Sequence, residues 1–496
     1  MRARKATIRT SEAGKAAEVF ANLEALPDGW TRAKLGDVCK TTSGGTPSRK
    51  NAEYFAGGIP WVKSGELPDG LVTEVEERIT EDAVANSSAK LFPAGTLLIA
   101  LYGATVGKLG ILKEDATTNQ AVCAVFPPEH LDTKYLFWYL RCVRSDLVAQ
   151  AVGGAQPNIS QGILRELPVP VAPLDQQKRI VAEIEKQFSR LDEAVANLKR
   201  VKANLKRYKA AVLKAAVEGR LVETEAQRAR RAAQGSTNVA GGRKPGATEG
   251  RRYETGEQLL QRILETRRSQ WKGKGKDKEP AAPDTSDLPE LPEGWVWASV
   301  QQLAEVQLGK MLDRQKHRSG KELPYLRNIN VRWDSVDSSD LLTMFFKESE
   351  FDRFGLQAGD VLVCEGGEPG RAAVWDGRDL GMMYQKAIHR VRFIGGYQQR
   401  MLVFYLEFMV KTGHLERWFT GSTIKHFTRE SFAQLPIPVA PATEQIRIVA
   451  EVDRRLSLLR ETEAQVDANL QRAERLRQSV LQRGFAGGLV TAAGPN

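Results

Sequence analysis

The feature that most constrains the fold of this 496-residue chain is a long internal repeat, with a period close to half its length. LPDGW at Leu26–Trp30 returns 265 residues later as LPEGW at Leu291–Trp295. LPVPVAPLDQQKRIVAEI from Leu167 returns 268 residues later as LPIPVAPATEQIRIVAEV from Leu435. A repeat of this length indicates two copies of one structural unit.

The two copies repeat unevenly. Their openings and proline-rich exits are nearly identical, whereas the globular blocks between them share only weak matches, such as PAGTLLIALYG from Pro93 with QAGDVLVCEGG from Gln357, and Gln120 with Gln385. A duplication alone is also explained by the fusion of an ancestral homodimer. The unevenness favours two similar supports that present different binding surfaces.

After each proline-rich exit the apolar residues recur in steps of four and three, which is the seam of a coiled coil. We expect rods of about 40 residues, roughly 60 Å long, that pair antiparallel. The alternative is that each helix lies on its own globular block. The expected seam residues are Ile184, Phe188, Leu191, Val195, Leu198, Leu205 and Val212 in the first helix, and Val452, Leu456, Leu459, Val466, Leu470 and Val480 in the second.

These patterns predict an α+β protein: two tandem mixed α/β domains, separated by a pair of long antiparallel coiled-coil helices, with pseudo-twofold symmetry. The expected parts are an N-terminal extension over 1–25, which we expect to be helical, a first domain over 26–172, a helix over 173–222, a basic flexible linker over 223–290 with a short helix near 254–271, a second domain over 291–440, and a C-terminal helix over 441–490.

The charge and the cysteines set the broad class. Lys and Arg outnumber Asp and Glu by 72 to 61, and the net charge of +11 is compatible with a polyanionic partner. Residues 223–285 hold 14 basic and 9 acidic side chains, so the linker carries five of these charges. The four cysteines form no ligand pair, which favours a reducing, cytoplasmic setting with no metal site.

No segment reads as a signal peptide or a membrane span. The N-terminal residues have charge without an apolar run. The stretch Leu91–Leu112 is long enough to cross a membrane, but Pro93 and several glycines interrupt it. Its counterpart in the second copy carries Asp360 and Arg371, so we expect both stretches to form buried strands with turns.

A search for catalytic motifs predicts no catalytic residue. GATVGKLG from Gly103 lacks the spacing and the hydroxyl of a phosphate-binding loop. FPPE at Phe126 lacks the amide or carboxylate that precedes the prolines of an adenine-methylation motif. Asp360 and Glu365 resemble half of a nuclease carboxylate set, with no lysine to complete it. A nuclease and a coiled-coil scaffold without nucleic acid remain the alternative readings.

Taken together, the LPxGW openings, GGTPSRKNAEYFAGGIPWVKSGEL from Gly44, PYLRNINV from Pro324 and the paired LPxPVAP helices resemble the specificity subunits of type I restriction-modification systems. The resemblance covers nearly the whole chain. The long basic linker and the N-terminal extension depart from the family pattern, so the resemblance gives them no role.

The resemblance implies a non-catalytic subunit, needed for both modification and restriction in phage defence. Each target recognition domain would read one half of a bipartite, asymmetric double-stranded DNA target, while the helices set the spacer and dock two adenine methyltransferase subunits. Motor-nuclease subunits are optional partners. S-adenosylmethionine, ATP and Mg²⁺ would bind those partners and not this chain, in the cytoplasm of a bacterium or archaeon.

Lys and Arg supply phosphate contacts, and Arg, Lys, Asn and Gln match the base edges of the grooves. We therefore select loop residues of these types, together with small hydroxyl residues, as candidate DNA contacts. A solvated surface role is the alternative for each. The candidates are Thr46, Ser48, Arg49, Lys50, Lys63, Ser64, Gln120, Gln156 and Asn158 in the first block, and Lys310, Arg314, Lys316, Arg327, Asn328, Asn330, Arg332, Arg371, Lys386, Lys425 and His426 in the second.

Overall fold

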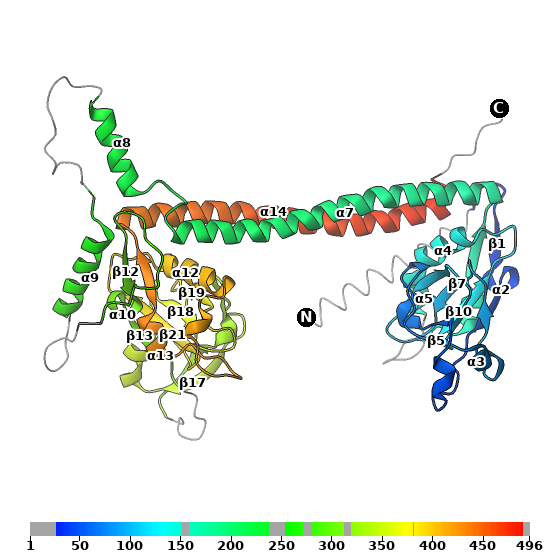
Figure 1. Ribbon diagram of the computed structural model, residues 1–496, viewed down its shortest axis with the longest axis horizontal. Coiled ribbons are helices and arrows are strands. Elements are labelled where there is room, and N and C mark those ends of the chain that lie inside the picture. The colour runs from blue at the N-terminus through cyan, green and yellow to red at the C-terminus, as the bar shows by residue number, and fades with distance from the viewer. Residues whose placement is uncertain are drawn as a thin grey trace. The chain divides into compact units, whose positions relative to one another are not determined.

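The computed structural model describes residues 26–150, 158–237, 253–270, 279–311, 319–379 and 381–489 (Figure 1). The chain divides into two compact units. Unit 1 comprises residues 1–199 and 467–496, and unit 2 comprises residues 200–466. Each unit combines sheets with helices, and the predicted fold class of two mixed domains and two long helices is confirmed. No helix in the described ranges is long and apolar enough to cross a membrane.

Unit 1 is built on a five-stranded sheet whose two faces are both covered. In β7, Leu97 and Ile99 pack with helix α4, whereas Leu98 and Ala100 face a second apolar cluster, as the period of two along a strand requires. Across the sheet the strands are β2 (Lys40–Ser43), β10 (Val122–Phe126), β7 (Leu97–Ala100), β8 (Leu109–Leu112) and β4 (Gly70–Val72), and α4 is Thr133–Cys142.

A second sheet of unit 1 contains a parallel pair between β3 and β9. Its strands in order are β5 (Arg78–Ile79), β3 (Ile59–Val62), β9 (Ala116–Thr118) and β6 (Leu91–Phe92). The short helices of unit 1 are α2 (Leu35–Val38), η1 (Ala52–Phe55), η2 (Ser64–Glu66), α3 (Glu81–Ala85), α5 (Arg144–Ala149) and α6 (Gln161–Arg165).

Unit 2 repeats this strand order with one strand fewer in each of the two sheets, among the residues described. Its main sheet has the order β13 (Ala304–Leu308), β21 (Ile388–Phe393), β18 (Val361–Cys364) and β19 (Ala372–Val374), and β14 (Lys321–Leu326) pairs with β17 (Leu342–Phe346) and, parallel, with β20 (Met383–Tyr384). Its other elements are α10 (Val300–Leu303), η3 (Asn328–Asn330), β15 (Val331–Arg332), β16 (Ser335–Val336), η4 (Glu348–Glu350), α11 (Phe351–Phe354), α12 (Gln399–Lys411), η5 (Glu416–Trp418) and α13 (Arg429–Gln434).

The repeated sequence segments form the same joint in each unit. In unit 1, β1 (Thr31–Lys34) pairs with β11 (Pro168–Val171), and in unit 2, β12 (Val296–Ser299) pairs with β22 (Pro436–Val439). The strand that follows each LPxGW opening therefore pairs with the LPxPV exit, and each exit strand leads into a long helix.

Matching hydrogen bonds hold these joints together. The indole N–H of Trp30 donates to Gln176 Oε1 (2.9 Å), and that of Trp295 donates to Glu444 Oε1 (3.0 Å). In unit 1 the buried Gln177 donates from Nε2 to the carbonyl of Ala172 (2.7 Å). In unit 2 Gln445 makes the same bond to Ala440 at the same distance.

Each long helix, α7 (Leu174–Val217) and α14 (Ala442–Phe485), has 44 residues and contributes to both units. Both end before the expected boundaries of 222 and 490, because Gly219 and Gly487 adopt positive φ (66° and 77°), which ends a helix.

The two helices run antiparallel in each unit. In unit 1, Ile184 near the start of α7 packs with Val480 and Leu481 near the end of α14. In unit 2, Val212 near the end of α7 shares a core with Val452 near the start of α14. The predicted shared seam is therefore present, and neither helix lies alone on its own block.

Burial along the seam is uneven. Most of the 13 expected seam residues are buried. Five are only half-buried: Leu191, Val195, Leu198, Leu205 and Leu470.

The expected linker, residues 223–290, contains more secondary structure than predicted. The short helix expected near 254–271 is α9 (Gly256–Gln270), whose Leu259 and Ile263 are buried in the core of unit 2. Residues 225–237 were expected to be flexible, but they form a further helix, α8 (Glu225–Thr237). Thr224 caps it, because its hydroxyl accepts from the backbone N–H of Gln227 (3.2 Å). The N-terminal extension lies outside the described residues.

Candidate nucleic-acid interface

Most of the predicted contacts of unit 1 lie in the segments that follow strands β2, β3 and β9. The backbone N–H of Gly45 donates to the carbonyl of Thr118 (2.9 Å), and the indole of Trp61 donates to the carbonyl of Gly45 (3.0 Å). A β-carbon on Gly44 would lie 2.1 Å from Thr118 O, so this approach requires glycine. The contact brings Thr46 to Gln120, and their side chains share a hydrogen bond.

Two of the candidate DNA contacts of unit 1 have cationic side chains that form ion pairs with carboxylates. Arg49 forms an ion pair with Glu77 (2.6 Å) and lies over the ring of Phe55 (4.3 Å to the centroid). Lys63 pairs with Glu76 (2.8 Å) and with Glu77 (3.1 Å). The Arg49 guanidinium holds the pKa of the Glu77 carboxyl below its usual range. These carboxylates fix the two cations in place and reduce their net charge.

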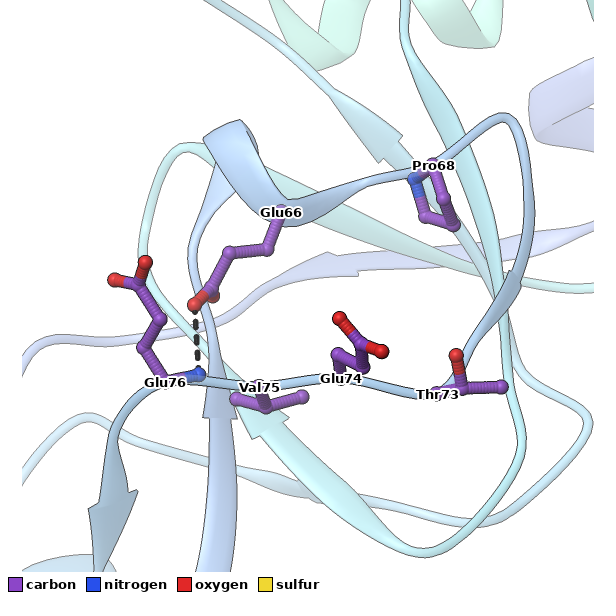
Figure 2. Close-up of a pocket in the computed structure, with 6 residues that line it drawn as sticks. All are labelled: Glu66, Pro68, Thr73, Glu74, Val75 and Glu76. Atoms are coloured by element: carbon purple, nitrogen blue, oxygen red, sulfur yellow. Dashed lines mark hydrogen bonds between the residues drawn. The ribbon is translucent and has the colours of Figure 1, made fainter.

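A hollow of about 370 Å³ next to Lys63 does not suit a phosphate (Figure 2). Three glutamates line it, and the Glu66 carboxylate accepts hydrogen bonds from the backbone N–H of Lys63 (2.7 Å) and of Glu76 (3.0 Å). Glu66 therefore shapes the turn. The lining residues are Glu66, Pro68, Thr73, Glu74, Val75 and Glu76.

In unit 2 most of the predicted contacts belong to five segments that touch one another, which we call the loop cluster: residues 309–311, 326–330, 364–371, 384–387 and 420–427. Asn328 Nδ2 donates to the carbonyl of Gly366 (3.2 Å), and Arg371 donates to the carbonyl of Asn328 (2.9 Å). The other segments join through backbone bonds: Phe427 N–H to Glu365 O (2.8 Å), Glu365 N–H to Ala387 O (2.9 Å) and Lys386 N–H to Lys310 O (2.7 Å).

The structure contradicts the expectation that three of the candidates lie at the surface. Lys310 is 5% exposed and donates to Glu350 (2.6 Å) and to the carbonyl of Phe345 (2.9 Å). Asn330 is 2% exposed and accepts from the backbone N–H of Arg327 (2.8 Å). Arg371 is 8% exposed and pairs with Glu368 (2.8 Å). Other groups of this chain bind these three polar side chains. The three side chains therefore support the loops from inside the fold.

For the remaining candidates, contact with DNA stays a prediction. Arg327 is half-buried and pairs with Asp340 (2.8 Å), and Asn158 forms an isolated β-bridge with Tyr102. Gln156, Arg314 and Lys316 lie outside the described residues. The exposed candidates are Thr46, Ser48, Arg49, Lys50, Gln120, Asn158, Arg332, Lys386, Lys425 and His426, and the half-buried ones are Lys63, Ser64, Arg327 and Asn328.

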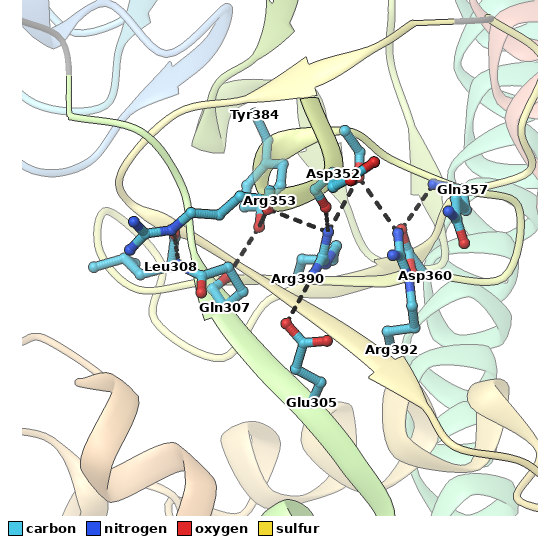
Figure 3. Close-up of polar contacts among 11 residues, drawn as sticks. Glu305, Gln307, Leu308, Asp352, Arg353, Gln357, Asp360, Tyr384, Arg390 and Arg392 are labelled. Atoms are coloured by element: carbon cyan, nitrogen blue, oxygen red, sulfur yellow. Dashed lines mark hydrogen bonds and ion pairs between the residues drawn. The ribbon is translucent and has the colours of Figure 1, made fainter. Parts of the chain in front are cut away.

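The carboxylate that resembled part of a nuclease site has a structural partner (Figure 3). Both Asp360 oxygens accept from Arg392 (2.7 Å each), and one also accepts from the backbone N–H of Gln357 (2.8 Å). The neighbouring Arg390 is 2% exposed and donates to the carbonyls of Arg353 and Gly355 (3.2 Å each). Asp360 therefore neutralises a half-buried arginine of β21 and is not open to a metal or a substrate.

Sequence reasoning gave no role to several residues that shape the site. Arg390 and Arg392 were missed, although HRVRF in β21 places both on one face of a buried strand. Gln177 and Gln445 were quoted within the repeat without a role. Apolar residues at the surface of the loop cluster, such as Ile329 and Ile424, were also missed, because an apolar residue in a sequence predicts a core position.

Comparisons with known proteins fit this architecture. Residues 27–207 match the family model of the type I restriction modification DNA specificity domain. The chain is 34% identical over 167 residues to the type I restriction enzyme EcoR124I/EcoR124II specificity subunit of Escherichia coli, a match that covers 32% of this chain and 41% of that protein.

Two longer matches cover nearly the whole chain. The EcoKI specificity subunit of Escherichia coli K12 is 21% identical over 481 residues, which are 94% of this chain and 90% of that protein. A solved chain from work on complex assembly and conformational transition of the type I R-M system superposes with a TM-score of 0.60 at 17% identity, over 94% of this chain and 99% of that one. The latter likeness concerns the fold.

Proposed function

We propose that this chain is a specificity subunit of a type I restriction-modification system, as its similarity to that family supports, and that each of its units reads one half of a bipartite DNA target. One observation carries the proposal: the same sheet scaffold and joint occur twice, while the loops that they support carry different side chains. Two different sets of loops on one scaffold suit two different short sequences.

In this proposal the chain itself catalyses no reaction. The helices α7 and α14 set the spacer between the half-sites and dock two adenine methyltransferase subunits, and motor-nuclease subunits join for restriction. S-adenosylmethionine, ATP and Mg²⁺ bind those partners. The pairing of Asp360 with Arg392 supports this division of labour over a nuclease in unit 2.

Mapping modified adenines in cells that express the chain with methyltransferase subunits tests the reading role. We expect one asymmetric motif of two short words separated by an unspecified spacer. Binding of the purified complex to that duplex should weaken steeply as salt rises, because phosphate contacts release counterions. A complex with no sequence preference would contradict the reading role and favour the alternative of a coiled-coil scaffold.

Heptad deletions test the spacing role. Removing residues 195–201 and 464–470 together keeps the helical phase of the seam, because seven residues make one coiled-coil repeat. We expect a changed spacer with unchanged half-site words, read by the same adenine mapping. Leu458→Ala on α14 is the control, because this side chain is 53% exposed and lies outside the seam. An unmoved spacer in the deletion variant would refute the role of the helices.

A further inference from the structure

The loop cluster of unit 2 exposes apolar side chains among its polar ones. Ile424 is 66% exposed, Met311 is 59% exposed and Ile329 is 48% exposed. Among the described residues of unit 1, the large exposed apolar side chains outside α14 are Leu71 in β4 and Leu91 in β6, and neither belongs to the loops that carry its candidate contacts. Single exposed apolar residues are ordinary, but three in one set of touching loops need an explanation.

Ile424 projects from a firmly held hairpin. Thr420 and His426 exchange two backbone hydrogen bonds of 2.8 Å, which leave residues 421–425 as the tip. Gly421 has φ of 92°, and a β-carbon there would lie 2.3 Å from the carbonyl of Ile424, so the tip turns tightly. At its base Phe427 is fully buried. The position of Ile424 is therefore set by the fold.

Ile329 lies next to the same surface. Its neighbour Asn328 bonds to the carbonyl of Gly366, and a β-carbon on Gly366 would lie 3.5 Å from Nδ1 of His426. Asn328 and His426 thus flank Gly366. The exposed Ile329 follows Asn328 directly in the sequence, and the exposed Ile424 lies two residues before His426. Lys425 is exposed on the same hairpin, where it pairs with Glu416 (3.0 Å), and Lys386 is exposed on a further segment of the loop cluster.

This mixture matches the major groove better than a protein partner. The core of a protein interface is depleted of charged residues, whereas here amide, imidazole and ammonium groups alternate with the isoleucines. Asn and His can hydrogen-bond base edges, Lys binds phosphates, and the apolar feature of the major groove is the thymine C5-methyl group.

We propose, on the basis of the DNA-reading role above, that Ile424 and Ile329 contact thymine methyl groups, so that the half-site read by unit 2 contains at least one A·T pair identified through its methyl group. The described loops of unit 1 that carry candidate contacts expose no large apolar side chain, so we expect them to read their half-site without such a contact. The two units then differ in the chemistry of reading as well as in the bases read.

Replacing thymine by deoxyuridine tests this directly, because it removes the methyl group and leaves the pairing edge unchanged. The probe is a duplex of the mapped target, substituted one thymine at a time in both half-sites. Binding is measured with the full chain assembled with its methyltransferase subunits. We expect about three- to fivefold weaker binding for at least one thymine in one half-site, and less than a twofold change in the other.

Variants assign the effect to these residues. In Ile424→Ala or Ile329→Ala, the sensitive thymine should lose most of its effect, because the partner of the methyl group is gone. Leu342→Ala is the matched control, since this residue of β17 is 43% exposed and lies outside the loop cluster. It should keep the full sensitivity.

Two results would overturn the inference: no thymine sensitivity in a complex that still selects its target, or equal sensitivity in all three variants. Either result leaves the DNA-reading role intact. A complex without any target preference would instead remove that role.

Discussion

Units 1 and 2 have the same scaffold and differ in what fills equivalent positions. The central strand of the main sheet shows this best: Cys123 pairs in register with Ser43 and Ile99 in unit 1, and His389 pairs with Leu308 and Val363 in unit 2. Both side chains are fully buried. The backbone pairing is retained because it builds the sheet, whereas the side chains beneath the loops are free to diverge.

The ends of the two long helices show the same contrast. Near the end of α14, Phe485 packs edge-on against Tyr135 (5.1 Å between centroids) and Tyr139 (5.2 Å) in unit 1. The corresponding residue of α7 is Val217, buried in the core of unit 2. Aromatic rings thus fill the core next to this helix end in unit 1, and an aliphatic side chain fills it in unit 2.

Phe485→Ala is expected to have the largest effect, a loss of about 3–5 kcal/mol, because it opens a large cavity among aromatic rings. Val217→Ala removes fewer atoms and should cost about 2 kcal/mol. Hydrogen exchange of the β7 and β18 amides reports on unit 1 and unit 2 separately. Phe485→Ala should reduce protection in β7 and Val217→Ala in β18. Equal losses in both strands would mean that the units unfold together.

His389 makes the stability of unit 2 fall at acidic pH, whereas Cys123 at the equivalent position has no such effect on unit 1. Burial lowers the pKa of His389 to about 4 from its usual 6.5, while Nε2 bonds to the carbonyl of Phe427 (2.7 Å). The unfolded chain therefore binds more protons than the folded chain between these values. The stability of unit 2 falls as the pH drops through this range, by about 2 kcal/mol at pH 5.

His389→Cys copies unit 1 and should remove this acid dependence. Denaturant unfolding at pH 7 and pH 5, with exchange in β18 as the local measurement, gives the difference for both proteins. Burial raises the pKa of Cys123 to about 12, so a thiol in such an environment does not titrate in this range. Identical pH dependence in wild type and variant would show that another group is responsible.

The sequence allows the repeat and the helical seam to be predicted, because each depends on a pattern many residues long. Ile184 and Val452 are buried as their period requires. Lys310 was misjudged because its partner Glu350 comes from a distant segment that no local pattern connects to it. Ile424 was missed for the opposite reason: only the closed hairpin places an isoleucine at a tip.

The joints themselves provide the smallest and most local test. Unit 2 has Glu444 where unit 1 has Gln176, and the second carboxylate oxygen of Glu444 accepts from the backbone N–H of Glu225 at the start of α8 (2.9 Å). Burial raises the pKa of Glu444, so the ionised form carries a cost that this bond and the indole of Trp295 oppose. The carboxylate therefore ties α8 to unit 2 at little net gain to the whole fold.

Glu444→Gln should release the start of α8 while leaving global stability nearly unchanged. An amide can present only one oxygen, so one of the two N–H donors loses its acceptor, at a cost of about 1–2 kcal/mol. Amides over 225–231 should then exchange about 5- to 30-fold faster, with β18 unaffected. Gln176→Glu in unit 1 is the matched control and should leave α8 unchanged. Unaltered exchange in Glu444→Gln would mean that the Thr224 cap and the ion pair of Glu225 with Arg447 hold the helix without Glu444.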